Sequence, residues 1–310
     1  MKIAWVRIIA GLMAAAFGCA ASAQTKMVLG YTAGNPTMGA FVAKDQGFFA
    51  RRGLDVTLQF TPVGSTIPAA LASNSLQVGT ITFPVFLLAN EGGVALQAVA
   101  GMAIISDKTP VTGVASRAGS GIKRPADFVG KRIATPGLNG NLHVTFMMWL
   151  KRAGVDPKAP IYVEAAFPQM PDMMKGGQVD AALLVEPFLK RSIDTKVGDF
   201  VAYHPTEVMN GRMEVFYTMS KKFIDENPKA IGAFKDAIRE GHDWIAKNTD
   251  AARLTQITYL KLPEAVAKSI PLPTFQAEVT VADVQAWIDA CKEYGITKGT
   301  ATVRQVLWQP

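Results

Sequence analysis

Hydrophobic residues recur along this chain either at the spacing of a helix face or at every second position, as in a strand. Stretches with these two patterns alternate. In the segment 38–49 they fall on one face of a helix, whereas Leu54, Val56 and Leu58 alternate with polar residues as in a half-buried strand. The same alternation continues through the rest of the region 27–103. A chain of alternating strands and helices predicts an α/β fold with mostly parallel sheets.

Turn-forming residues divide this first region into elements. Glycine and proline stand between the apolar runs, and a proline just inside a helix start is favourable because its missing N–H would have no partner there. We expect strands at 27–31, 54–60, 76–82 and 96–103, and helices that begin at Asn35-Pro36, Gly64-Ser65 and Phe83-Pro84.

The clearest strand–turn–helix unit spans residues 131–152, KRIATPGLNGNLHVTFMMWLKR. Arg132–Thr135 has the pattern of a strand that Pro136-Gly137 stops, and an amphipathic helix follows. The turn between them leaves backbone N–H groups at a helix N-terminus, where the helix dipole amounts to roughly half a positive charge. It therefore predicts an oxyanion site, although such turns often only link two elements. Neither nucleotide-binding glycine fingerprint is present.

An internal similarity favours two related lobes. Residues 74–86 and 175–188 share the order of helix end, turn, buried strand and proline-started helix. The length also suits two lobes better than one core, since domains typically have about 50–200 residues. We expect lobe I to comprise 24–108 and 212–310, and lobe II to comprise 109–211.

The N-terminus is typical of an export signal. Lys2 and Arg7 precede the apolar run 8–16, and small residues lead to a cleavage site after Ala23. Cys19 offers a competing lipoprotein interpretation, although the residues before it form a poor lipobox. No later stretch has the roughly 20 apolar residues that span a bilayer, so we expect a soluble periplasmic protein with residues 1–23 removed as the signal peptide.

Charge and cysteine content restrict the partners and the chemistry. Loss of Lys2 and Arg7 lowers the formal charge from +7 to +5, and the remaining basic residues are scattered, which argues against nucleic acid. Cys291 is the single cysteine of the mature chain and shares a helical face with Val284 and Trp287. It is expected to be a buried structural thiol. We expect a monomer without a cofactor.

Four local patterns resemble a known family, the periplasmic substrate-binding proteins of ABC importers for sulfonates, taurine, nitrate and thiamine precursors. The patterns are FVAKDQGFF at 41–49 with GLDV at 53–56, FVGKRIA at 128–134, GQVDAA at 177–182, and VEPF at 185–188. The resemblance runs from Met27 to about Ala246. It implies a bilobal type II periplasmic-binding-protein fold with two crossings between lobes, a ligand in the cleft, and closure that presents the complex to a membrane permease.

The ends of the predicted strands supply the candidate ligand site, since ligands of open α/β sheets bind there. Gly64 and Ser65 from lobe I and 139–141 from lobe II are expected to hold the anion through hydroxyl, amide and backbone donors. The full set of candidates is Asn35, Gly64, Ser65, Thr82, Phe83, Asn139, Gly140, Asn141, His143 and Glu186.

Three of these residues have two interpretations each. His143 either contacts the ligand or bonds its own loop. Glu186 either accepts a hydrogen bond from a ligand amine or amide, or caps the helix that begins at Pro187. Phe83 either forms an apolar wall of the site or packs in a core. The sequence leaves these alternatives open.

The function that these features favour is capture of a small organic anion, a sulfonate or a carboxylate, for an ABC transporter permease. The candidate loops lack an arginine fork, which suits a singly charged group better than a phosphate. A neutral pyrimidine bonded to Glu186 is the alternative ligand, and a sensor role beside a membrane receptor is a further possibility. An enzyme on the same fold is less favoured, because His143, His204 and His242 are far apart in sequence and no nucleophile motif is present.

Overall fold

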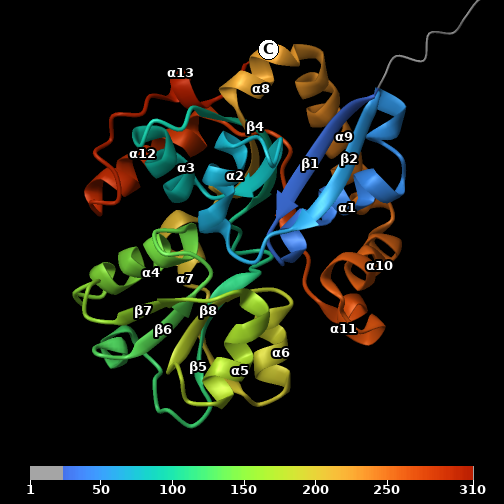
Figure 1. The fold of residues 1–310 in the computed structure, drawn as a ribbon. Helices are drawn as coiled ribbons and strands as arrows, with labels where there is room; N and C mark the ends of the chain where they lie inside the picture. Colours follow the sequence, from blue (N-terminus) through green and yellow to red (C-terminus); the bar gives the residue numbers. More distant parts are fainter. Residues whose placement is uncertain (1–23, 310) are drawn as a thin grey trace, which may run out of the picture.

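The computed structural model describes residues 24–309, and they form two α/β lobes (Figure 1). The predicted signal peptide, with Cys19 and the cleavage site after Ala23, lies outside the described residues. No helix among the described residues is long and apolar enough to cross a membrane.

Each lobe is built on one sheet. The six strands of lobe I lie in the order β11-β4-β10-β3-β1-β2 and the five strands of lobe II in the order β7-β6-β8-β5-β9. The strands of lobe I are β1 (Thr25–Tyr31), β2 (Leu54–Phe60), β3 (Val78–Ile81), β4 (Leu96–Ile104), β10 (Met213–Ser220) and β11 (Thr274–Phe275). Those of lobe II are β5 (Thr112–Arg117), β6 (Arg132–Thr135), β7 (Ile161–Glu164), β8 (Ala181–Val185) and β9 (Gly198–Ala202).

Both sheets are mixed, which differs from the expected mostly parallel arrangement. In lobe I, β10 lies antiparallel between β3 and β4, and in lobe II, β5 lies antiparallel between β8 and β9. β5 and β10 are the strands by which the chain enters a lobe after crossing from the other one. A strand that enters a lobe from the cleft begins at the cleft edge of the sheet. It therefore runs antiparallel to the strands that end at that edge.

Helices flank both sheets. They are α1 (Met38–Asp45), α2 (Ile67–Ala72), α3 (Phe83–Glu91), α4 (Asn141–Arg152), α5 (Met170–Lys175), α6 (Phe188–Asp194), α7 (His204–Met209), α8 (Lys221–Glu226), α9 (Pro228–Lys247), α10 (Thr249–Leu260), α11 (Glu264–Ser269), α12 (Val281–Glu293) and α13 (Val303–Val306). In Figure 1, α10 and α11 extend from lobe I toward lobe II. Leu260, at the end of α10, packs against the cores of both lobes.

Two helix starts show how local chemistry sets the element boundaries. We expected a helix to begin at Asn35-Pro36, but Asn35 opens a short 3-10 turn and does not cap α1. Its Nδ2 donates to the Pro271 carbonyl at 2.7 Å. The α12 start is capped, because Thr280 and Asp283 exchange hydrogen bonds. Asp283 also accepts from the Met213 N–H, which fixes the start of β10 against α12.

Aromatic side chains fill three hydrophobic clusters. Phe41 and Phe234 lie in the cluster between the lobe I sheet and α1 and α9, and Phe146 lies in the lobe II cluster. A third cluster surrounds Trp287 on the other face of the lobe I sheet. Cys291 belongs to it and is fully buried, which confirms the prediction of a structural thiol, and burial raises its pKa to about 12.

The two connections between the lobes lie side by side. β4 leaves lobe I next to β10, which returns to it, and the pairing extends past the strand ends through hydrogen bonds of Ile105 with Arg212 and with Gly211. The predicted lobe boundaries at 108/109 and 211/212 fall near these crossings and stay a prediction.

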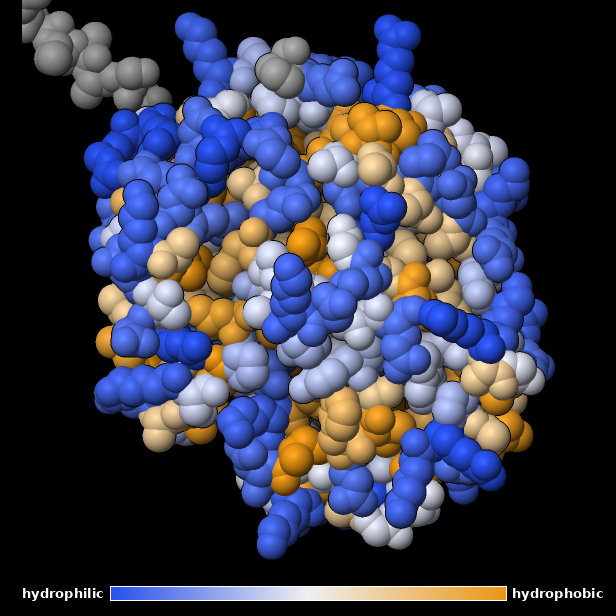
Figure 2. Space-filling view, turned by 180° about the vertical axis from the view of Figure 1, so that it is seen from behind, coloured by the Kyte–Doolittle hydropathy of each residue, from blue (hydrophilic) through white to orange (hydrophobic). Residues whose placement is uncertain are grey.

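The surface carries charged and apolar residues intermixed. Figure 2 shows one face, on which hydrophilic residues cover most of the outline and hydrophobic ones form separate small patches. The large apolar side chains that are exposed belong to distant elements; among them are Phe60, Leu88, Val129 and Phe200.

Candidate ligand-binding site

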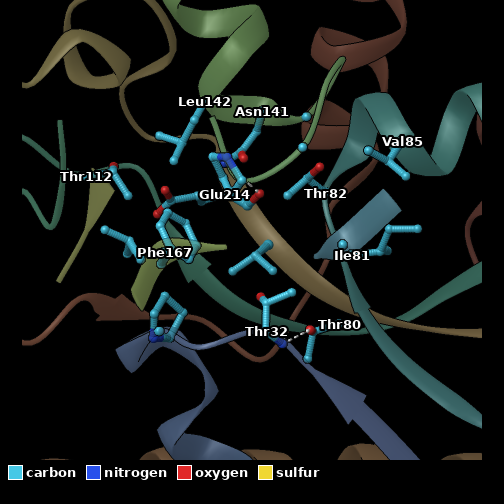
Figure 3. Close-up of a pocket in the computed structure, with 18 of the residues that line it drawn as sticks. Thr32, Thr80, Ile81, Thr82, Val85, Thr112, Asn141, Leu142, Phe167 and Glu214 are labelled. Atoms are coloured by element: carbon cyan, nitrogen blue, oxygen red, sulfur yellow. Dashed lines mark hydrogen bonds between the residues drawn. The ribbon is translucent and has the colours of Figure 1, made fainter. Parts of the chain in front are cut away.

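A pocket lies between the lobes where the strand ends meet. It contains about 720 Å³ of empty space, and part of that space is open to solvent. Figure 3 shows its side chains converging from both lobes. The polar residues of the lining are Thr32, Thr37, Ser65, Thr80, Thr82, Thr112, Asn141 and Glu214, and the larger apolar ones are Ile81, Val85, Met102, Leu142, Phe167, Val185 and Val215.

Helix starts from both lobes reach this pocket: the 3-10 turns that lead into α1 and α2, and the N-termini of α3 and α4. α3 begins directly after Thr82, whose hydroxyl makes no capping bond, and α4 begins at Asn141 after Gly140. The first N–H groups of a helix have no partner within the helix and carry its positive dipole end. The described lining residues include no lysine or arginine, so the helix ends supply the positive potential that comes from the lining itself.

Five of the predicted site residues line the pocket. They are Gly64, Ser65, Thr82, Gly140 and Asn141. Each follows the C-terminal end of a strand, which is why the rule for open α/β sheets found them. The structure brings together the two turns that we expected to face each other across the cleft.

The other five predicted residues lie outside the lining. Asn35 is fully buried and links the lobes through its N–H, which donates to the Glu186 carbonyl at 3.3 Å. Phe83 is buried in the core of lobe I, with its ring centroid 4.3 Å from that of Phe216. Asn139 adopts the left-handed conformation, with φ of 60°, within the loop before α4.

His143 bonds its own loop. Its Nδ1 accepts from the Asn139 N–H at 2.9 Å, and its ring packs 4.0 Å from that of Tyr162. Burial lowers the pKa of His143 to about 4, so the ring is neutral at physiological pH. His143 therefore agrees with the interpretation that it bonds its own loop, and it holds the loop before α4 in place.

Glu186 caps the helix that follows it. Its Oε2 accepts from the Lys190 N–H at 3.0 Å in α6, and its side chain is 3 % exposed. Burial raises the pKa of Glu186 to about 7, and the helix contact with Lys190 opposes that rise. The geometry around Glu186 therefore agrees with the capping interpretation.

Among the lining residues that sequence reasoning missed, Glu214 is the ionisable one. It is the ionisable side chain among the described lining residues, it is 3 % exposed, and its Oε2 has no hydrogen-bond partner. Burial raises the pKa of this carboxyl to about 7, while hydrogen bonds from Thr112 and Asn141 lower it. Figure 3 shows Glu214 beside both residues in the middle of the pocket. The available signal was a glutamate at the start of the otherwise apolar run 213–219.

One contact joins the lobes at the mouth of the pocket. Ser65 Oγ of lobe I donates to Glu164 Oε1 of lobe II at 2.5 Å, and the Leu138 N–H donates to the other oxygen at 3.1 Å. Glu164 thus holds a lobe I turn and a lobe II loop at the same time.

The arrangement is equipped to hold a ligand and is poor in catalytic groups. Within residues 24–309 no group of three or more His, Cys, Asp or Glu side chains could bind a metal ion. His204 and His242 are buried outside the lining: the Leu142 carbonyl is the partner of His204, and the ring of His242 packs against Phe275. Hydroxyls, helix N-termini and one carboxyl group remain as the chemistry of the pocket.

Two α/β lobes around a pocket of this kind define the class of periplasmic-binding-protein-like folds. The alkanesulfonate-binding protein SsuA from Xanthomonas axonopodis pv. citri, solved with bound MOPS, superposes with a TM-score of 0.80 over 92% of this chain and 99% of that one. The two sequences are 16% identical, so this likeness establishes the fold.

The chain belongs to the family described as NMT1/THI5 like, whose model matches residues 35–252. It is 25% identical over 257 residues to the nitrate/nitrite binding protein NrtA of Nostoc sp., which covers 75% of this chain and 57% of NrtA. It is also 25% identical over 215 residues to the formylaminopyrimidine-binding protein of Halalkalibacterium halodurans, over 68% and 63% of the two chains. The match therefore spans less than two thirds of the length of either relative. These relatives are substrate-binding proteins.

Proposed function

We propose that this protein captures a small organic anion, a sulfonate or a carboxylate, between its lobes and delivers it to the permease of an ABC importer. The observation that carries the proposal is the convergence of two helix N-termini, of α3 and α4, on a pocket of hydroxyl and apolar side chains. Such helix ends bind anions without a basic side chain. Val85, Leu142 and Phe167 offer apolar surface to an organic body.

The proposal also includes export of the protein to the periplasm, where it would meet the permease. The N-terminal residues have the order of a signal peptide, so the mature protein would work as a monomer in the periplasm after cleavage at Ala23. The fold neighbour and the relatives support this role, since their names describe anion- or solute-binding proteins. Catalysis is not part of the proposal, because the described histidines and Cys291 lie outside the lining.

Titration calorimetry of the mature protein tests the proposal. The panel is ethanesulfonate, butanesulfonate, benzoate, nitrate and an aminopyrimidine. We expect an organic acid to bind more tightly than nitrate, and Thr82→Val to weaken it by about tenfold or more, since a hydrogen bond to a charged group contributes about 1.5–3 kcal/mol. Ser73→Ala, which changes an exposed hydroxyl that bonds Ala70 outside the lining, is the matched control. Tighter binding of nitrate than of every organic acid would contradict the choice of ligand.

A neutral aminopyrimidine is the second candidate ligand. The observation in its favour is the unpartnered Oε2 of Glu214, which can accept a hydrogen bond from an amino group. The formylaminopyrimidine-binding relative supports the same idea. Binding of the aminopyrimidine with no binding of the acids would select this candidate.

A further inference from the structure

Glu214 stands out because a site that we propose for anions contains a buried acid. Its carboxyl group projects from β10 into the pocket beside Thr112 and Asn141 (Figure 3). The Asn141 side chain also donates to the Glu214 main-chain carbonyl at 3.4 Å, so the residue lies where lobe I meets α4 of lobe II. A ligand that contacts both lobes passes close to this group.

No cation compensates this carboxyl group. Within residues 24–309, no Lys, Arg or His nitrogen lies within 4.0 Å of it in an ion pair, and Oε2 is left without a partner. An ionised carboxylate in this position would repel a bound anion and would lack its own solvation. A protonated carboxyl group would instead supply a donor that the pocket otherwise takes from hydroxyls and backbone N–H groups.

The ionisable groups on the surrounding elements are engaged elsewhere. Three acidic groups already accept hydrogen bonds: Asp283 of α12 from the Met213 N–H, Glu186 before α6 from the Lys190 N–H, and Glu164 of β7 from Ser65. Two histidines contact the backbone, His143 of α4 at the Asn139 N–H and His204 of α7 at the Leu142 carbonyl. Arg212, which precedes β10, is partly exposed. Since none of them forms an ion pair with Glu214, its protonation responds to burial and to the ligand.

We propose that Glu214 contacts the ligand as a neutral carboxylic acid and donates a hydrogen bond from Oε2 to its anionic group, so that capture above neutral pH takes up a proton from solvent. This inference rests on the proposed function and narrows it to singly charged acids that accept a hydrogen bond. Burial already holds the pKa of Glu214 near 7, so the proton is available at neutral pH. A bound anion raises that pKa further.

Affinity should therefore decline above neutral pH. With a ligand-free pKa of about 7, only about 3% of Glu214 is protonated at about pH 8.5, which predicts an affinity roughly thirtyfold lower than at about pH 6. Glu214→Gln keeps an N–H donor of similar shape and has no charge to lose. We expect this variant to bind acids with nearly equal affinity at both pH values, and more tightly than the parent at about pH 8.5.

Calorimetry with ethanesulfonate and benzoate, in two buffers of different ionisation enthalpy, measures both affinity and proton uptake. The expected result at about pH 8.5 is an uptake of close to one proton per ligand by the parent protein, which Glu214→Gln abolishes. Glu186→Gln is the matched control, because Glu186 is an equally buried carboxyl group with its pKa also raised to about 7 but lies outside the lining. That variant should keep the decline in affinity between the two pH values.

The outcomes separate this inference from the proposed function. Binding of an acid by the parent without proton uptake would overturn the inference and leave the function in place. A loss of affinity in Glu214→Gln at both pH values, together with a preference for 2-aminoethanesulfonate over ethanesulfonate, would show instead that Glu214 is an ionised acceptor. Failure of every acid to bind either protein would contradict the proposed function, and the inference with it.

Discussion

At the scale of single residues, the partner of a buried polar group decides what it does. His143 and Glu186 bond the backbone of their own neighbourhoods and lie outside the lining, whereas Glu214 lines the pocket with an oxygen that has no partner. His143 Nε2 is also buried without a partner, but it does not line the pocket. All three are buried to a similar degree. Their different roles therefore follow from whether the polar group reaches the pocket, because burial alone does not distinguish a structural group from a ligand contact.

His143→Ala is expected to weaken acid binding by no more than about threefold. The side chain lies outside the pocket lining and acts through one hydrogen bond to the Asn139 N–H, which is typically worth about 1 kcal/mol. Asn141→Ala, at the start of the same helix and in the lining, should cost about tenfold. Calorimetry compares the two, and a loss beyond tenfold in His143→Ala with unchanged stability would place His143 in contact with the ligand.

Five of the ten residues predicted from sequence line the pocket. Ser65, Thr82 and Asn141 were found because they follow predicted strands, and strand ends of an α/β sheet meet at one edge. Phe83 also follows a strand, but its ring turns into the core, and spacing says nothing about that direction. Glu214 was missed because a glutamate at the start of a strand has no spacing signature until the opposite lobe is placed over it.

At the scale of elements, the short bond between Ser65 and Glu164 connects the turn before α2 to β7. Both residues belong to loops or strand ends that the two lobes bring together, so the bond exists only while the lobes are close. The Ser65–Glu164 bond helps to hold the two lobes together, and it lies at the mouth of the pocket. Its effect should appear in the lifetime of the complex.

Glu164→Gln and Ser65→Ala are both expected to speed ligand release by about threefold to tenfold. Ser65→Ala removes one charge-assisted hydrogen bond at an exposed position, worth about 1 kcal/mol after solvent competition. Glu164→Gln removes the charge from this bond and from the bond that the Leu138 N–H donates. Stopped-flow displacement measures the release rate. Because the two residues act on each other, the double variant should be no faster than the worse single variant. Additive effects in the double variant would show that the two side chains act independently.

Element boundaries were predictable where two local signals agreed. The strand 132–135 is found as expected, since proline and glycine follow it, and α4 begins and ends within the amphipathic stretch that we identified. β9 and α7 were not anticipated, because each is only five or six residues long and lacks a periodic apolar face. The direction of β5 and β10 depends on where the chain crosses between lobes, which periodicity does not record.

At the scale of the whole molecule, two sets of buried groups oppose each other as pH changes. Burial lowers the pKa of His143, His204 and His242 to about 4, 3 and 4, and raises that of Glu186 and Glu214 to about 7. Between about pH 5 and 6 the unfolded chain binds three histidine protons that the native protein excludes, while the native protein binds two glutamate protons that the unfolded chain lacks.

For these five groups, the net difference of one proton lowers the free energy of unfolding by about 1.4 kcal/mol per pH unit as the pH drops through this range. Carboxylates whose pKa is lowered in the folded protein, such as Glu91 and Glu240, change the free energy of unfolding in the same direction. Glu214→Gln removes one of the opposing protons and should steepen the slope by about 1.4 kcal/mol per unit. Urea unfolding at about pH 5, 5.5 and 6 measures both slopes. Equal slopes in the two proteins would mean that Glu214 is already ionised in the folded state.

The pairing of β4 with β10 has a consequence for how this chain is put together. Ile105 hydrogen-bonds to Gly211 and Arg212, so everything between these residues leaves and re-enters lobe I at one point, as the loop of a β-hairpin would. In topological terms the second lobe is an insertion into a hairpin. A tight turn of a few residues could join Ile105 to Gly211 without stretching the backbone, and the strand order of the first sheet would be preserved.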